Sequence, residues 1–213
     1  DDKPFLVDSV TAYLESAGRG IHTIFHPLLV VRRSADGRYE ELVLDQGDDA
    51  DPAAPPAFGE MRESWIHIEI DRESDAAHRA EIATALTRVL GDVQEAVEDW
   101  PKMTSRAATL AAELRANAPA GVSAQECERA ADFLDWMADN NFTFLGARDY
   151  TLTGDDTAGE LAAISGSGLG LLRADADMTS ALTKITGPAL EKARERRVLF
   201  VTKANSRATV HRP

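Results

Sequence analysis

The chain has 213 residues, which is enough for one large domain or two small ones. Its net charge of −13 argues against a nucleic-acid-binding surface over most of its length. No apolar run approaches the ~20 residues of a membrane span, and acidic residues stand where a signal peptide would carry basic ones. Cys127 is the only cysteine, which excludes an internal disulfide and fits a reducing, cytoplasmic compartment.

The charge is unevenly distributed along the chain. Residues 191–213 carry a net charge of +5, so residues 1–190 carry −18. A solvated basic helix followed by a strand explains such a run of charge, and we favour it over a docking surface for an acidic neighbour.

The chain begins with a predicted helix and a predicted strand. Apolar residues at helical spacing predict a helix over 4–17, with Pro4 in its first turn and Gly18 just after its end. β-Branched and aromatic residues predict a strand over 21–33, in which Pro27 marks an edge or a bulge.

A hairpin and a further strand follow. Asp36-Gly37 is a strong hairpin signal, and the return strand covers 39–44. Residues 45–60 have no periodicity and hold three prolines, so we expect a surface loop there. Alternating apolar and polar residues predict a half-buried strand over 64–71.

Helices occupy the middle of the chain. An apolar stripe predicts a helix that begins near Ser74 and is broken by Pro101, after which a second helix runs to about Ala118. Proline, glycine and small residues cluster at 117–123, which is the best candidate for a domain boundary.

The remaining residues predict a second mixture of helices and strands. Ser123 and Glu126 fit the capping box of a helix that ends at Asn140-Asn141. We expect strands over 142–152 and 159–165, followed by a Gly-rich turn over 166–173. A helix within 178–197, which Gly187-Pro188 interrupts, and a last strand over 198–204 complete the chain.

Histidines and the single thiol offer little catalytic chemistry. His22 and His26 share a face of the predicted strand but stand ~13 Å apart by the strand rise, and His67 can neighbour them across the sheet. A zinc site needs three or four converging ligands, so we interpret these histidines as structural. Cys127 lies near a helix N-terminus, where a thiol pKa can fall, but an inert buried thiol is the simpler interpretation.

The stretch "GSGLG" (166–170) does not carry a nucleotide site in our interpretation. It lacks the third glycine of the dinucleotide fingerprint at its proper offset, and no Gly-Lys-Ser/Thr occurs in the chain. These glycines more simply serve a tight turn where backbone meets backbone.

The opening stretch "DDKPFL" (1–6) precedes the free backbone N–H groups of a helix N-terminus. Such groups can bind a carboxylate. A cap by Asp1 or Asp2 would satisfy the same donors, and on physical grounds alone we favour the cap.

Several stretches resemble a known family. Asp2-Lys3-Pro4-Phe5-Leu6-Val7 resembles the loop and first helix of an ACT domain, whose usual pattern is Asp-Arg/Lys-Pro-Gly-Leu-Leu. Four stretches, in order along nearly the whole chain, together resemble the N-terminal region of the large NAD-specific glutamate dehydrogenases of bacteria. They are "DDKPFLVDSV…GRGIHTIFHPLLVVRR", "ESWIHIEIDR", "FLDWMADNNFTFLGARDY…SGLGLLR" and "VTKANSRATVHRP".

The resemblance implies an α+β fold with two domains. A ferredoxin-like, ACT-type sandwich would cover 1–100, a connecting helix and linker 101–120, and a PAS-type domain 121–213, continuing beyond the fragment. ACT domains follow the order β-α-β-β-α-β, so the sandwich would lack its first strand, which would precede Asp1. The sheet could then be completed by a second chain.

The resemblance also implies a role. The chain would be a non-catalytic regulatory and oligomerisation region of an enzyme that converts glutamate to 2-oxoglutarate and ammonia. No catalytic residue, metal or cofactor is expected in this stretch, and NAD would bind the catalytic domain downstream in the parent chain. The expected partners are further copies of the chain, that catalytic domain and an amino-acid effector, with no nucleic acid and no membrane.

An effector would bind at the opening turn, where ACT domains often bind amino acids. The residues concerned are Asp2, Lys3, Pro4, Phe5 and Leu6. Phe5 replaces the glycine that lets a ligand approach the backbone, which favours self-association over ligand binding. The alternative function is a stand-alone amino-acid-sensing module of the ACT type. A self-contained enzyme has only scattered histidines and one thiol in its support.

Overall fold

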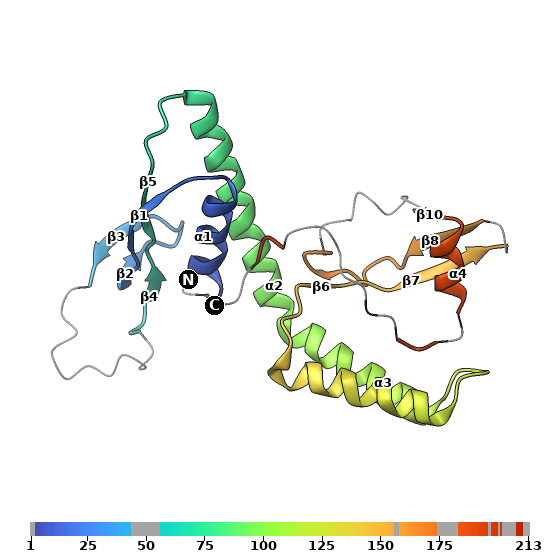
Figure 1. The fold of residues 1–213 in the computed structure, drawn as a ribbon. Coiled ribbons are helices and arrows are strands. Elements are labelled where there is room, and N and C mark those ends of the chain that lie inside the picture. Colours follow the sequence, from blue (N-terminus) through green and yellow to red (C-terminus); the bar gives the residue numbers. More distant parts are fainter. Residues whose placement is uncertain are drawn as a thin grey trace. The chain divides into compact units, whose positions relative to one another are not determined.

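The computed structural model describes residues 3–43, 56–155, 158–173, 183–195, 197–199, 201 and 208–210. They form an α+β structure in which the chain divides into two compact units between Leu90 and Gly91. This division falls inside the long helix α2 (Ala76–Ala116), so both units contain part of that helix (Figure 1). Among the described residues, no helix has both the length and the apolar run that crossing a membrane requires.

Helix α1 (Leu6–Ser16) opens the first unit and confirms the predicted helix. It begins after Pro4 rather than at it, because Phe5 is the N-cap residue. Val10 and Leu14 are buried on its inner face. Gly18 follows the helix with a φ of 70°, the left-handed conformation that commonly closes helices.

The predicted strand over 21–33 is two strands in the structure. They are β1 (Ile21–Phe25) and β2 (Leu28–Arg33), and Pro27, which has no N–H to donate, lies in the break. The hairpin prediction is confirmed. Gly37 has a φ of 81° and donates its N–H to the Ser34 carbonyl at 2.9 Å, and the return strand is β3 (Tyr39–Leu42).

The sequence did not predict strand β4 (Glu60–Ser64), which pairs antiparallel with β2. Its sequence, Glu-Met-Arg-Glu-Ser, lacks the apolar alternation that indicates a strand. Its pairing draws on charge instead, because Glu60 and Glu63 form ion pairs with arginines of β2. The loop predicted over 45–60 includes Glu60, which is the first residue of β4. Residues 44–55 lie outside the described part of the chain.

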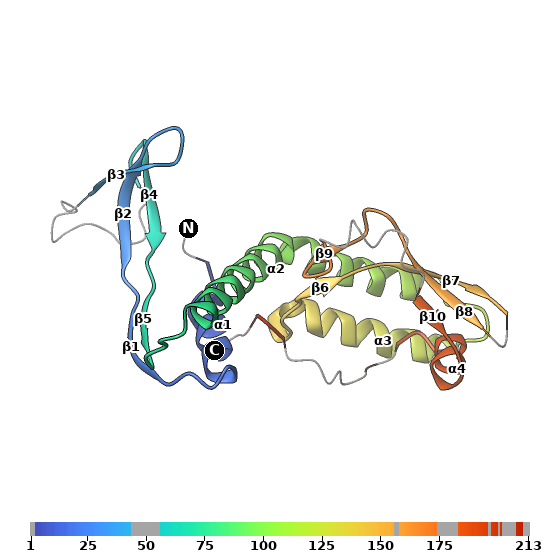
Figure 2. The ribbon, with the colours of Figure 1, turned by 90° about the horizontal axis from the view of Figure 1, so that it is seen from above.

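Strand β5 (His67–Ile70) lies within the strand predicted over 64–71 and pairs antiparallel with β1. Its alternation is confirmed, since Ile68 and Ile70 are partly buried while His67 and Glu69 are exposed. The two isoleucines pack against the buried cluster of Val10, Leu14 and Val89. Helix α1 and the start of α2 lie on the same side of the β1–β5 pair (Figure 2).

The predicted break at Pro101 is wrong, because α2 runs through it without interruption. Proline has a helical φ but removes one backbone hydrogen bond and crowds the carbonyl four residues earlier. Packing on both sides of Pro101 outweighs this cost: Val93 and Ala96 before it, and Met103 and Ala107 after it, are buried. Tertiary contacts of this kind supply most of the stability of a protein helix.

Helix α3 (Ala124–Trp136) continues the second unit and begins where the sequence predicts. Ser123 Oγ accepts the Glu126 N–H at 3.1 Å, which confirms the predicted N-cap. Cys127 is buried on the inner face, and the helix ends in a wide turn of π-helix at Met137–Asn141, where Asn140 has a φ of 58°.

The turn at 117–123 lies between α2 and α3, inside the second unit. The domain limits expected from the family resemblance, at 1–100, 101–120 and 121–213, stay predictions, as does the PAS-type character of the C-terminal part.

The described residues of the second unit form two small antiparallel sheets. One has the strand order β10 (Thr183–Ile185), β8 (Gly159–Ala163), β7 (Tyr150–Gly154), and the other pairs β6 (Gly146–Ala147) with β9 (Leu169–Gly170). The strand predicted over 159–165 is thus confirmed as β8. The strand predicted over 142–152 is instead two short strands, β6 and the start of β7.

The helix predicted within 178–197 is confirmed only after Gly187-Pro188. Strand β10 precedes this pair, and Pro188 is the first residue of α4 (Pro188–Arg194), because proline suits the first helical turn. Residues 174–182 lie outside the described part of the chain. Of the strand predicted over 198–204, only residues 198, 199 and 201 are described, and none of them is in a strand.

Candidate functional site

The opening turn is described from Lys3 onwards, so the aspartate cap favoured by the sequence stays a prediction. Phe5 occupies the N-cap position with φ 73° and ψ −2°, and it makes no side-chain cap hydrogen bond. Its carbonyl accepts the Ser9 N–H at 3.0 Å. Asp1 and Asp2 lie outside the described residues, so of the predicted effector residues only Lys3, Pro4, Phe5 and Leu6 are described.

The left-handed backbone at Phe5 explains why glycine is the usual residue in the pattern that this turn resembles. A positive φ places Cβ close to the following carbonyl oxygen and costs a non-glycine residue about 1–2 kcal/mol. Such strain tends to collect at functional sites, and here it lies at the start of a helix. Asp8 stands in the first turn of α1, where its carboxylate already complements the positive end of the helix and disfavours a second anion.

A groove of about 600 Å³ adjoins the opening turn within the first unit. Its volume is within the range of small-molecule sites. Ser64 and His67 are its polar members, and its apolar members come from α1, the β4–β5 segment and α2: Leu6, Val10, Leu14, Ile66, Ile68, Ile70, Leu86 and Leu90. Of the described effector residues, Lys3 to Leu6, Leu6 lines this groove.

Of the histidines on the predicted strand, His22 contacts an aspartate. His22 Nε2 lies 2.9 Å from Asp71 Oδ1, and the Gly20 N–H donates to Asp71 Oδ2 at 2.8 Å. The hydrogen bond from the Gly20 N–H is the main cause that lowers the pKa of the Asp71 carboxyl, and the hydrogen bond with His22 is the second. No group of three His, Cys, Asp or Glu side chains among the described residues could hold a metal ion. His211 lies outside those residues.

A half-buried ion pair joins β2 to β4. Arg33 contacts both carboxylate oxygens of Glu63, with Nη2 to Oε2 at 2.9 Å, and the Trp65 indole N–H donates to the same Oε2 at 3.0 Å. The Arg33 hydrogen bond is the main cause that lowers the pKa of Glu63 to about 2. This arrangement holds two strands together and leaves Glu63 ionised, so it is unsuited to proton transfer near neutral pH.

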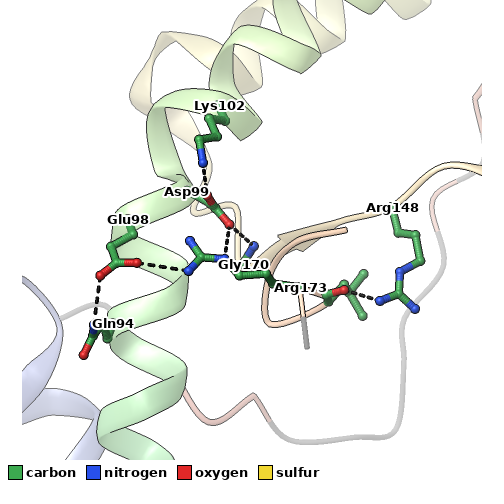
Figure 3. Close-up of polar contacts among 8 residues, drawn as sticks. Gln94, Glu98, Asp99, Lys102, Arg148, Gly170 and Arg173 are labelled. Carbon is green, nitrogen blue, oxygen red and sulfur yellow. Dashed lines mark hydrogen bonds and ion pairs between the residues drawn. The ribbon is translucent and has the colours of Figure 1, made fainter. Parts of the chain in front are cut away.

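The most buried charged group in the described residues is Asp99 of α2, whose side chain is 1% exposed (Figure 3). One oxygen, Oδ2, accepts the Gly170 N–H at 2.9 Å and Arg173 Nε at 2.8 Å. The other, Oδ1, accepts Lys102 Nζ at 2.8 Å. Arg173 also binds Glu98, one residue earlier on the helix, at 3.0 Å. We call these contacts the Asp99 cluster.

The Asp99 cluster satisfies a buried charge that would otherwise be costly. Arg173, the largest cause, together with Lys102 and the Gly170 N–H, holds the pKa of the Asp99 carboxyl well below its usual range. The pKa of the Arg173 guanidinium is raised by the same hydrogen bond to Asp99. Both groups keep their charges at any physiological pH, which indicates an anchor and not an acid or base.

The anchor fixes the Gly-rich turn of residues 166–173. Gly170 has a φ of 57°, and a Cβ added there would collide with the carbonyl oxygen of Leu145. A Cβ at Gly168 would likewise collide with the Leu172 carbonyl oxygen, and Arg148 donates to that same oxygen (Figure 3). The prediction of a tight turn where backbone meets backbone is thus confirmed.

Sequence reasoning missed Asp99, although a signal was present. Asp99 falls three residues after Ala96 and four before Met103, on the apolar stripe of α2, and both neighbours are buried. An aspartate on such a stripe is rarely buried without a partner. The pattern indicates a buried pair but not the identity of Arg173, which lies 74 residues further along the chain.

Arg115, near the end of α2, gathers three carboxylates of α3. It binds Asp135 at 2.7 Å, Asp132 at 2.8 Å and Glu128 at 3.0 Å, and these bonds raise the pKa of its guanidinium, Asp135 most. The carboxylates are exposed, so solvent weakens each pair. Their geometry joins two helices of the second unit.

Comparison with known proteins places the chain in a family. Residues 1–86 match the model described as "Glutamate dehydrogenase, ACT1 domain". The NAD-specific glutamate dehydrogenase of Pseudomonas aeruginosa is 34% identical over 218 aligned residues that cover the whole chain. That of Halomonas elongata is 37% identical over 82% of the chain. The chain belongs to the family of large NAD-specific glutamate dehydrogenases.

The match is to an N-terminal region of these enzymes. The chain spans 13% of the Pseudomonas aeruginosa protein and 10% of the Halomonas elongata protein. The NAD-specific glutamate dehydrogenase of Mycobacterium tuberculosis is 29% identical over 79% of the chain, again over 10% of its own length. No solved structure matches the chain significantly.

The left-handed backbone at Phe5 gives a stability prediction. Phe5→Gly and Phe5→Ala both remove the ring, but only glycine relieves the positive φ. We expect the glycine variant to be more stable than the alanine variant by about 1 kcal/mol in urea unfolding. At Glu81, an exposed position in the interior of α2, the matched pair should show the opposite order, because glycine weakens a helix interior. Equal stability of the two Phe5 variants would contradict the assigned backbone strain.

The Asp99 cluster gives a pH-dependent prediction. Asp99→Asn should lower the free energy of unfolding at pH 7 by about 2 kcal/mol, because the buried Gly170 N–H and Arg173 lose their charged acceptor. A carboxyl with a lowered pKa in the folded state stabilises the fold above its ordinary value of 3.8. The difference in the free energy of unfolding between the unchanged protein and Asp99→Asn should therefore become smaller as the pH falls below 3.8. Urea unfolding at a series of pH values measures this difference.

The control for this experiment is Asp139→Asn, at an exposed position in the wide turn that ends α3. It should leave the free energy of unfolding nearly unchanged at every pH tested. If Asp99→Asn lowered the free energy of unfolding by the same amount at pH 7 and at a pH well below 3.8, the ion-pair explanation would be contradicted.

Proposed function

We propose that this chain is a regulatory and assembly region, without catalytic residues of its own, of a large NAD-dependent glutamate dehydrogenase. The observation that carries the proposal is the alignment to the Pseudomonas aeruginosa enzyme. This alignment covers the whole of the present chain and only 13% of that enzyme. The match of residues 1–86 to the ACT1 domain of glutamate dehydrogenase supports the same role.

The chemistry of the described residues supports a non-catalytic role. The strongly shifted carboxyls, Asp99 and Glu63, are each held ionised by an arginine and lie within structural contacts. Neither is suited to proton transfer near neutral pH. Cys127, the single thiol, is buried at 2% exposure, where it cannot readily reach a substrate.

In the proposed parent enzyme, the reaction takes place elsewhere in the chain. Glutamate would be oxidised to 2-oxoglutarate and ammonia in a downstream catalytic domain, with NAD bound there. Residues 1–213 would then contact other copies of the chain and that domain, and an effector that prefers one arrangement would shift the equilibrium between arrangements.

The second candidate is a stand-alone amino-acid sensor that binds its ligand at the opening turn. The left-handed residue at the start of α1 and the neighbouring apolar groove favour it. Asp8, in the first turn, and the ring of Phe5 oppose it. A sensor requires saturable binding by the isolated chain, whereas an assembly region does not.

One set of measurements on the purified chain separates these functions. We expect no glutamate-dependent reduction of NAD by absorbance, and a dimer or larger assembly by light scattering. A melting temperature that rises with the concentration of one amino acid would favour the sensor. Phe5→Gly, which opens the approach to the backbone, should then enlarge that rise. NAD reduction by the chain would contradict both proposals.

A further inference from the structure

Strands β1 and β2 pair with β5 and β4 as one long antiparallel ribbon. Phe25 of β1 lies opposite His67 of β5. The Trp65 N–H donates to the Pro27 carbonyl at 3.1 Å, so the ladder continues across the break between β1 and β2. Strand β2 then pairs with β4 in the same register. Because the register is unbroken, side chains alternate between the same two faces along this whole length.

The two faces of the ribbon have different surroundings. Ile68 and Ile70 of β5 pack against the buried cluster of α1 and α2, so the even-numbered side of β4 and β5 points toward these helices. Figure 2 shows that β2, β3 and β4 extend beyond α1 and the start of α2. The opposite side holds the odd-numbered residues of 23–33 and 61–69, and we call it the outer face.

The outer face is apolar and aromatic over most of its length. Phe25 is 65% exposed, and Met61 and Trp65 are exposed as well. Tyr39 of β3, which lies opposite Arg33, extends this face. Its ring meets the Trp65 ring edge-on, with centroids 6.2 Å apart. A sheet face in contact with water is normally polar, whereas gathered aromatic and methionine side chains are typical of protein interfaces.

The charges on the outer face of the ribbon nearly cancel. Arg33 and Glu63 form the half-buried ion pair described above and neutralise each other. Glu69 lies at one end of the face, where His67 Nε2 is 3.6 Å from its Oε1. The whole chain, by contrast, carries a net charge of −13. An identical chain is therefore repelled by the protein as a whole, but not by this face.

The edge of the neighbouring sheet is less suited to an identical chain. Strand β3 lies at the edge of the β3-β2-β4 sheet and carries Glu40 and Glu41. Two β3 strands paired across a two-fold axis would bring these carboxylates together, which is unfavourable. Packing of two outer faces avoids this repulsion, because the sheets then lie about 10 Å apart and their apolar side chains interdigitate.

We propose that the outer face is the contact between two copies of this chain, which pack their ribbons face to face about a two-fold axis. Both copies supply the same residues to such a contact, and a neutral apolar face is complementary to itself. Burial of Phe25, Met61 and Trp65 removes apolar area from water, which drives the association. The proposal rests on the proposed assembly role and names the surface that performs it.

Light scattering of purified residues 1–213, over a range of concentrations, tests the proposal. We expect the unchanged protein to form a dimer. Phe25→Glu should raise the dissociation constant of this dimer by about a hundredfold or more, because a symmetric contact would bury two unpaired carboxylates. Met61→Glu, on the other strand of the ribbon, should have the same effect. Both side chains are exposed in the single chain, and circular dichroism checks that each variant is folded.

Leu28→Glu is the matched control, because Leu28 is 52% exposed and lies on the opposite face of the same ribbon. It should leave the dimer intact, and equal weakening by this variant would overturn the proposal. A dimer that persists in both outer-face variants would also overturn it, while the assembly role would stand. A chain that stays monomeric at every concentration would overturn the proposal together with that role.

Discussion

The second unit depends on one buried negative charge. Asp99 is almost fully buried on α2, and a carboxylate there is tolerable only if cations and N–H donors surround it. Arg173, Lys102 and the Gly170 N–H supply them, so the Gly-rich turn must stay against the helix for the charge to be satisfied. Because α2 also supplies Val89 to the core of the first unit, one helix contributes packing to each unit.

Much of the fold follows from local sequence signals, and the exceptions have physical causes. The Ser123 cap, the Gly37 hairpin and the alternation of β5 depend on neighbouring residues, so the sequence predicts them. Strand β4 was missed because its pairing with β2 draws on ion pairs across the sheet instead of an apolar face. The continuity of α2 through Pro101 was missed because buried contacts outweigh a local cost.

In the candidate sites, too, the sequence predicts local features but not contacts between distant residues. The sequence indicated a special turn at residues 2–6, and the positive φ of Phe5 gives it a physical basis, but the apolar groove beside it requires three elements to come together. The buried Asp99–Arg173 pair joins residues 74 positions apart, which no local pattern can link. The Asp99 cluster thus positions the backbone of the Gly-rich turn, which is a structural role.

The central claim, that this region regulates and assembles a glutamate dehydrogenase without taking part in its chemistry, is tested most directly in the parent enzyme. Residues 1–213 would be deleted, and glutamate-dependent NAD reduction, subunit assembly by light scattering and the response to amino-acid effectors would be measured together. The account predicts that the catalytic domain still reduces NAD at saturating substrate, while the assembled mass falls or the effector response is lost. Unchanged mass and effector response, or loss of NAD reduction by a folded and fully assembled enzyme, would contradict it.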